Sequence, residues 1–210
     1  MNRRYAGWVA GAAAAVLVAA GAVTYAVAED SGGPGTRTPG AESADAGFAR
    51  DMSVHHQQAV EMSYIVRDRT KNEEVRRLAY DIAQTQANQR GMMLGWLDLW
   101  GLPKVSADPP MTWMGMRGMP SAGDGALMPG MATDTELDRL RSLSGKPAEV
   151  LYLQLMTAHH QGGVHMAEGC AAKCTVDVEK RLAQGMVDAQ RSEIELMAGM
   201  LKERGARPRP

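Results

Sequence analysis

The sequence predicts an all-α protein, a bundle of four long helices made of two similar helical hairpins joined by a long crossover. Three features point to this fold. One motif occurs twice, apolar residues recur at helical spacing in four long segments, and helix-breaking residues separate those segments. The composition agrees, because the chain has a single Phe and is rich in Ala, Leu, Met, Glu and Arg, which favour helices.

The repeated motif marks a duplicated unit. Residues 51–62 read DMSVHHQQAVEM and residues 155–166 read LMTAHHQGGVHM, so equivalent positions lie 104 residues apart. The same offset aligns six further pairs downstream: Arg77 with Arg181, Leu78 with Leu182, Gln86 with Gln190, Met93 with Met197, Gly95 with Gly199, and Leu97 with Leu201. This match predicts two repeats, at about 48–100 and 152–204.

The first 28 residues have the form of an export signal. Arg3 and Arg4 precede an uncharged run that ends at Ala26-Val27-Ala28, a pattern typical of a cleaved secretory signal. The run is also long enough to span a bilayer as an uncleaved membrane anchor, and both interpretations are open. Both place the domain outside the cytoplasm, secreted or held at the cell surface.

The rest of the chain divides into a linker, the bundle and a tail. Residues 29–47 are rich in Gly, Ser, Thr, Pro and Ala and predict a flexible linker, while the bundle takes 48–204 and the tail 205–210. The long helices are expected at 48–68, 73–100, 148–171, and from a cap at Thr175 or Asp177 to about 204. Thr133, followed by Glu136, predicts a short extra helix that ends near Leu143.

The crossover, residues 103–132, has too many Pro and Gly residues for a long helix. It contains six methionines: Met111, Met114, Met116, Met119, Met128 and Met131. Closely spaced thioethers on a flexible backbone are suited to capturing Cu(I), with Trp113 lying over such a site. An exposed Met-rich segment is equally suited to binding a protein partner. Both interpretations are open.

On a helical wheel, each copy of the motif places its histidines and methionines on one broad face. The residues of this face are Met52, His55, His56, Ala59 and Met62 in the first copy, and Met156, His159, His160, Gly163 and Met166 in the second. Glu61 and its counterpart His165 point away. The small residues Ala59 and Gly163 would let the two helices approach closely.

Imidazole nitrogen and thioether sulfur on two facing helices predict a site for a soft or borderline metal ion. Thioethers favour Cu(I), imidazoles bind Cu(I), Cu(II) and zinc, and copper is therefore the preferred ion, with zinc as the alternative. The candidate ligands are His55, His56, Met52, Met62, His159, His160, Met156 and Met166. The alternative is structural, because methionines at helical spacing commonly fill a core.

Polar residues on the partner helices also align by the repeat. Gln86 corresponds to Gln190, and Gln89 corresponds to Glu193. Gln89 and Glu193 are placed to accept a hydrogen bond from an imidazole N–H and so to orient a metal ligand.

Two cysteines, Cys170 and Cys174, lie outside the repeated motif. In an exported protein this spacing of four residues predicts a disulfide at a helix end. The alternative is that the two thiolates bind a soft metal ion.

The doubled Met-x-x-His-His-Gln motif, together with Met128-Pro129-Gly130-Met131, resembles the domain of unknown function 305 family from about residue 47 to residue 201. The resemblance implies a ferritin-like four-helix bundle in exported bacterial proteins, some of them associated with copper. Carried over to this sequence, the implied ligands are Met52, His55, His56, Met156, His159 and His160. Glu61 and His165 differ between the copies, so the two halves are not chemically identical.

These observations favour an extracytoplasmic copper-binding protein that sequesters copper or hands it on. One alternative is a non-catalytic bundle that binds a protein partner, of unknown identity, through its Met-rich loop. A ferritin-like oxidase is less favoured, because a di-iron site needs Glu-x-x-His pairs and the sequence has none. No catalytic residues stand out, and a net charge of −1 provides no basic surface for nucleic acid.

Overall fold

Five α-helices and one short 3-10 helix make up the fold in a computed structural model that describes residues 38–116 and 123–209. They are α1 Ala44–Arg69, α2 Glu73–Leu99, η1 Thr112–Met114, α3 Asp134–Ser142, α4 Gly145–Lys173 and α5 Asp177–Glu203. Within residues 38–116 and 123–209 there is no β-strand, so the predicted all-α class is confirmed. The predicted leader, residues 1–28, lies outside the described residues.

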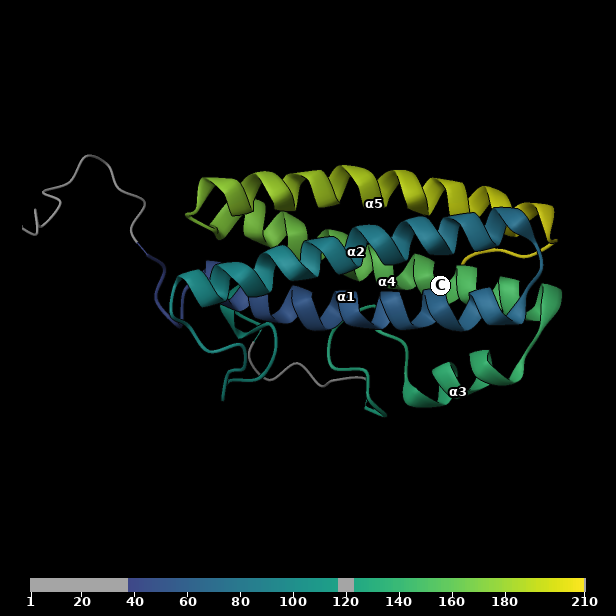
Figure 1. Cartoon of the computed structure of the whole chain (residues 1–210), viewed down its shortest axis with the longest axis horizontal. Helices are drawn as coiled ribbons and strands as arrows, with labels where there is room; N and C mark the ends of the chain where they lie inside the picture. Colours follow the sequence, from purple (N-terminus) through teal and green to yellow (C-terminus); the bar gives the residue numbers. More distant parts are fainter. Residues whose placement is uncertain (1–37, 117–122, 210) are drawn as a thin grey trace, which may run out of the picture. The chain divides into compact units, whose positions relative to one another are not determined.

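The four long helices lie side by side as two hairpins (Figure 1). Helix α1 packs along α2, α4 packs along α5, and α1 and α4 form the contact between the hairpins. The short helix α3 lies in the crossover and touches α1 and α4. The likeness to ferritin in particular stays a prediction. No helix of the described residues has the length and apolar character needed to cross a membrane.

Helices α1 and α4 run in opposite directions where they meet. Met52, which precedes the histidines of α1, shares one apolar cluster with Met166, which follows the histidines of α4. Met62 and Met156 share a second cluster. The two clusters therefore lie on opposite sides of the histidines, and the duplicated motif is arranged almost symmetrically about the middle of the bundle.

Two helices begin earlier than the sequence suggested. Helix α1 begins at Ala44 instead of Phe48, because Ser43 caps it by accepting a hydrogen bond from the Ala46 amide at 3.1 Å. The end of the predicted linker is therefore helical. Helix α4 begins at Gly145 instead of Ala148, because Pro147 falls in the first turn, where its missing N–H is not needed.

The start of α5 is stabilised from another helix. The expected caps, Thr175 and Asp177, are wrong: the N-cap is Val176, whose own side chain makes no capping hydrogen bond. Instead the buried Asp45 of α1 accepts hydrogen bonds from the main-chain amides of Thr175 and Val176, at 2.7 and 2.8 Å. By contrast, the capping box predicted for α3, at Thr133 and Glu136, is present.

The crossover packs onto the bundle more closely than an exposed Met-rich segment would. Met111 and Met128 are buried in the same cluster as Met52. Trp113 packs edge-on against Phe48, with ring centroids 5.8 Å apart, and donates its indole N–H to Asp51 of α1 at 2.9 Å. Trp113 is therefore fixed to α1 by a hydrogen bond and by packing. Met119 lies outside the described residues.

The segment from Met128 to Ala132 is held against both central helices. The Gln58 side chain of α1 donates to the Ala132 carbonyl at 2.8 Å and accepts from the Ala132 amide at 2.7 Å. On α4, the absence of a side chain at Gly162 leaves room for the Pro129 carbonyl. Gln58 and Gly162 are equivalent positions of the repeat, so the two copies differ where this segment docks.

We expect Gly162→Ala to lower the free energy of unfolding by about 1–3 kcal/mol, because its Cβ would overlap the Pro129 carbonyl. Gly185→Ala is the matched control, since a Cβ there meets nothing within 4 Å on the exposed side of α5. Alanine at Gly185 should raise stability by up to about 1 kcal/mol. Urea titration of both variants measures the difference, and a loss of the same size in both would contradict the docking of Pro129.

Candidate metal centre

The two histidine pairs lie at the centre of the bundle and are completely buried. His55 and His159 meet between α1 and α4, with ring centroids 3.7 Å apart and planes inclined by 32°. His56 and His160 flank them, at 6.4 Å from His55 and 6.3 Å from His159. We call these four residues the histidine layer. The prediction that the two copies of the motif face each other is confirmed.

Each outer histidine is held by the partner helix of its own hairpin. His56 Nε2 lies 2.8 Å from Gln89 Oε1, and His160 Nε2 lies 2.6 Å from Glu193 Oε2. These are the contacts predicted from the aligned positions of Gln89 and Glu193. Because both oxygens are acceptors, the proton of each imidazole lies on Nε2 and the lone pair lies on Nδ1.

One inner histidine is oriented by the facing helix. His159 Nε2 lies 2.9 Å from the main-chain carbonyl of His55. A carbonyl can only accept, so His159 also carries its proton on Nε2 and its lone pair on Nδ1. Three of the four imidazoles thus have a defined tautomer that leaves Nδ1 available as a metal ligand.

The centre contains many buried polar atoms that the described residues leave without a hydrogen bond. They are Nδ1 of all four histidines, Nε2 of His55, and the side-chain amide atoms of Gln86 and Gln190. Burying a polar group without a partner is unfavourable, and native proteins keep few such groups. These unpaired polar atoms are concentrated at matched positions of both repeats. This arrangement is suited to a group that accepts electron pairs, such as a metal ion.

Burial keeps three of the imidazoles, those of His55, His56 and His159, neutral. It lowers the pKa of His55 to about 3 and that of His56 to about 4, and it lowers the pKa of His159 well below the ordinary 6.5. The neighbouring imidazoles add to this effect at His55 and His159. Neutral imidazoles have a free lone pair, which is the form that binds metal ions.

The four candidate methionines lie in the apolar clusters on either side of the histidine layer, each fully buried. Met52 and Met156 precede the histidine pair by one helical turn, whereas Met62 and Met166 follow by nearly two. The eight predicted ligands therefore do not surround one point. Helix rise separates Met62 and Met166 from the first histidine of each pair by about 10 Å along the axis.

The small residue Gly163 has a different role from the one expected. A Cβ at this position would overlap the side-chain oxygen of Gln190, so the missing side chain makes room for a glutamine of α5. Gln190 is thereby brought into the centre of the bundle, where it is 4% exposed.

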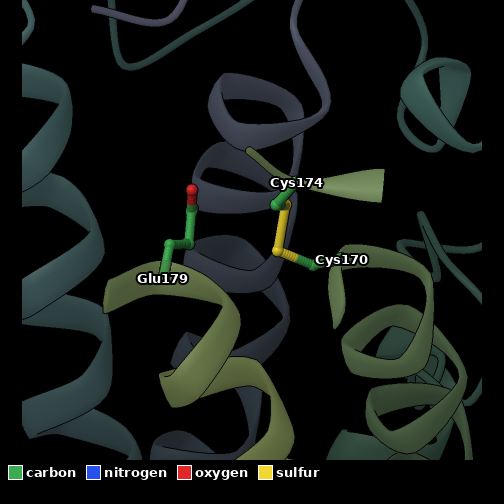
Figure 2. Close-up of side chains that lie close together, drawn as sticks. All are labelled: Cys170, Cys174 and Glu179. Carbon is green, nitrogen blue, oxygen red and sulfur yellow. A yellow bond between two sulfur atoms is a disulfide. The ribbon is translucent and has the colours of Figure 1, made fainter. Parts of the chain in front are cut away.

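A second group of ligand-type side chains lies at the end of the bundle near the α4–α5 connection. Cys170 and Cys174 form the predicted disulfide. Figure 2 shows Glu179 of α5 beside them. Among the described residues, these three make the one group of at least three His, Cys, Asp or Glu side chains whose ligand atoms all lie within 4.8 Å of one another. Sequence reasoning missed Glu179, because neither its spacing nor the repeat relates it to the cysteines.

The fold and the histidine layer define a class of helical proteins with a duplicated hairpin and a doubled Met-x-x-His-His motif on facing helices. The chain belongs to the domain of unknown function family DUF305, whose model matches residues 45–201. No curated protein matches the chain.

Several solved structures are similar to the chain. A DUF305 protein from Streptomyces coelicolor, which its description takes to be secreted, is 73% identical, with a TM-score of 0.76, and the match covers 81% of this chain and 99% of that one. A DUF305 fragment from Deinococcus radiodurans is 33% identical, with a TM-score of 0.63 and coverages of 76% and 96%. CopM in its Cu(II)-bound form is 25% identical, with a TM-score of 0.60 and coverages of 77% and 97%.

Proposed function

We propose that the protein binds copper outside the cytoplasm and sequesters it or transfers it. The observation that carries this proposal is the histidine layer, in which His55 lies against His159, His56 and His160 flank them, and all four buried imidazoles have Nδ1 unpaired among the described residues. Three of them are kept neutral by burial. Similarity to CopM, a protein solved in a Cu(II)-bound form, supports the choice of ion.

The residues fit copper by their chemistry. Imidazole nitrogen binds both Cu(I) and Cu(II), and zinc is the alternative ion. Gln89, Glu193 and the His55 carbonyl hold the Nε2 atoms of three imidazoles, which fixes the ring orientation and raises the basicity of the free nitrogen.

We assign the methionines a supporting role. Met52 and Met156, one turn from the histidines, are the proposed thioether ligands for Cu(I), since sulfur is a soft donor. Met62 and Met166 stand farther along the helices and complete the apolar walls of the site. A dry, apolar surrounding limits the access of water to a bound ion.

The proposed location rests on the leader and on a relative. Residues 1–28 have the form of a secretory signal or membrane anchor, and the Streptomyces coelicolor protein is taken to be secreted. The alternative function, partner binding through the Met-rich loop, is less favoured. Met111 and Met128 are buried in the core and are not free to contact another protein.

The test is copper binding by the full-length protein. We expect wild type to bind copper in stoichiometric amount, and the double variant His55→Ala/His159→Ala to lose that binding, because its two central nitrogen ligands are gone. Competition with a coloured chelator measures the affinity for Cu(I) and, separately, for Cu(II). His165→Ala is the control, because His165 is exposed and lies outside the histidine layer.

Wild-type affinity in the His165→Ala variant, together with loss in the double variant, would support the proposal. Undiminished copper binding by a folded double variant would refute it, and preference for zinc over both copper ions would reassign the metal.

A further inference from the structure

The α4–α5 connection brings three potential ligands together at one end of the bundle. Cys170 lies in the last turn of α4, Cys174 is its C-cap residue, and Glu179 lies in the first turn of α5. The two sulfur atoms and a carboxylate oxygen of Glu179 all lie within 4.8 Å of one another (Figure 2). Cys170 and Cys174 are joined as a disulfide, so neither sulfur is free to bind a cation in this state.

Glu179 is unusual for a glutamate because its side chain is completely buried, with 0% exposure. Neither carboxylate oxygen makes a hydrogen bond of ordinary geometry in the described part of the chain, and the polar side chain within reach of it is that of Asp45. A buried carboxyl group without a partner is strongly unfavourable and is ordinarily compensated by a proton, a basic side chain or a metal ion. No described basic side chain pairs with it, and burial raises the pKa of the carboxyl to about 9, so a proton compensates it in the oxidised protein. A cation that enters this position would take the place of that proton.

A second carboxylate adds negative charge to the same end of the bundle. Asp45 of α1 holds the connection by accepting hydrogen bonds from the amides of Thr175 and Val176, which follow Cys174 directly. Its position is thus fixed close to the disulfide, and its charge favours a cation there. Asp45 is already occupied by these amides, and we do not count it among the ligands.

We propose that reduction of the Cys170–Cys174 disulfide opens a second metal site, in which the two thiolates and the Glu179 carboxylate bind a borderline divalent cation of the Zn(II) class. Thiolate and carboxylate are both common zinc ligands, and a zinc ion with three protein ligands completes its coordination with water. The site is separate from the histidine layer and does not depend on the proposed copper function.

The chemistry balances with a dithiol as reductant. The dithiol breaks the S–S bond by thiol–disulfide exchange, gives two electrons to the cysteines and becomes a disulfide itself. The two cysteine thiols that form and the buried Glu179 carboxyl then release their protons to solvent when the cation binds, because thiolate and carboxylate are the ligand forms. Metal binding at this end of the bundle is therefore conditional on the reduced state of the cysteines.

The test uses the full-length protein in the His55→Ala/His159→Ala background, so that the histidine layer does not contribute. The disulfide is reduced without oxygen by a water-soluble phosphine, which takes up the oxygen of one water molecule as phosphine oxide while the cysteines take up two protons. Cd(II) is then added as a spectroscopic probe for the zinc class. Thiolate bound to Cd(II) gives an ultraviolet charge-transfer absorption that imidazole does not give.

We expect the reduced protein to bind one Cd(II) with this absorption and the oxidised protein to show none. Glu179→Gln, which keeps the size of the side chain and replaces the ionisable carboxyl ligand with a neutral amide, should weaken binding at least tenfold. The control Glu168→Gln changes an exposed glutamate of α4 and should bind as tightly as the unaltered background. Zn(II) occupies the same ligands but binds thiolate less tightly than the softer Cd(II), so a large excess of Zn(II) should lower the absorption.

Far-ultraviolet circular dichroism separates loss of the site from loss of the fold. The proposal is overturned by a reduced, helical protein that gives no charge-transfer absorption, or by equal affinity in the Glu179→Gln variant. It is also overturned if reduction alone unfolds the helices, since the site would then not exist in the reduced chain. Copper binding through the histidine layer is measured independently, so either result can stand without the other.

Discussion

Acidification from pH 7.5 to pH 4 is expected to lower the free energy of unfolding of the Glu179→Gln variant by about 3 kcal/mol or more. The pKa of His55 in the folded protein is about 3 and that of His56 about 4, against 6.5 for an ordinary histidine. Between these values the unfolded chain binds protons that the folded chain does not, so stability rises with pH. The stabilisation is complete above about pH 6.5 and is lost as the pH falls towards 4.

The size of the expected loss in the free energy of unfolding follows from the linkage between proton binding and folding. Each pKa unit corresponds to about 1.4 kcal/mol, so His55 alone contributes about 3 kcal/mol between pH 6.5 and pH 4. His159 acts in the same direction, because burial lowers its pKa as well.

The experiment uses the Glu179→Gln variant because Glu179 changes stability with pH in the opposite direction to the histidines. Burial, and then the negative charge of Asp45, raise the pKa of Glu179 from 4.5 to about 9. The folded protein keeps this proton where the unfolded chain loses it, so the contribution of Glu179 to stability decreases as the pH rises between these values. Glutamine removes that effect and leaves the histidines to determine the slope.

Denaturant titrations at several pH values, on metal-free protein, measure the expected change. His165→Ala in the same background is the control and should leave the slope unaltered, because His165 is exposed. Replacing His55 with Gln should make the slope shallower. A flat or inverted profile between pH 7.5 and pH 4 would contradict the neutral, buried state of the histidine layer.

Glu149→Ala is expected to lower the free energy of unfolding by about 3–5 kcal/mol. Glu149 pairs with Arg204 at 2.8 Å, with side chains only 9% and 8% exposed, and it also accepts a hydrogen bond from the Thr70 hydroxyl at 2.5 Å. This carboxylate therefore connects α4, the end of α5 and the end of α1. Its removal leaves the Arg204 guanidinium buried without its counter-charge, which is strongly unfavourable.

Glu168→Ala provides the matched comparison on the same helix. Glu168 pairs with Arg191, but these side chains are 46% and 60% exposed, and such surface pairs contribute at most about 1 kcal/mol. Thermal and urea unfolding of both variants at neutral pH measure the two losses. Equal losses would show that burial of the Glu149–Arg204 pair is not what makes it important.

Much of the fold could be predicted because its signals are local or repeated. The duplicated motif identified two hairpins, and the pairing of Thr133 with Glu136 identified the start of α3. The offset of the repeat also aligned Gln89 with Glu193, and the structure shows that both accept from an imidazole. These predictions needed no knowledge of how distant segments meet.

The rest depended on contacts between segments far apart in the sequence. Asp45 caps a connection 130 residues away, and nothing near Thr175 indicates that it does. Glu179 approaches the disulfide only because α5 turns back along α4. The burial of Met111 likewise follows from the docking of the crossover, which its high content of Pro and Gly residues did not reveal.

The stacking of His55 on His159 has a consequence for the smallest unit that could form this centre. Each hairpin supplies one inner and one outer imidazole and has one face that only the other hairpin covers. An isolated hairpin would therefore have half of the donor atoms and an uncovered apolar surface, and it could complete the centre only by pairing with a second copy of itself. Covalent linkage of the two halves keeps them at a high effective concentration, so assembly does not depend on how dilute the protein is.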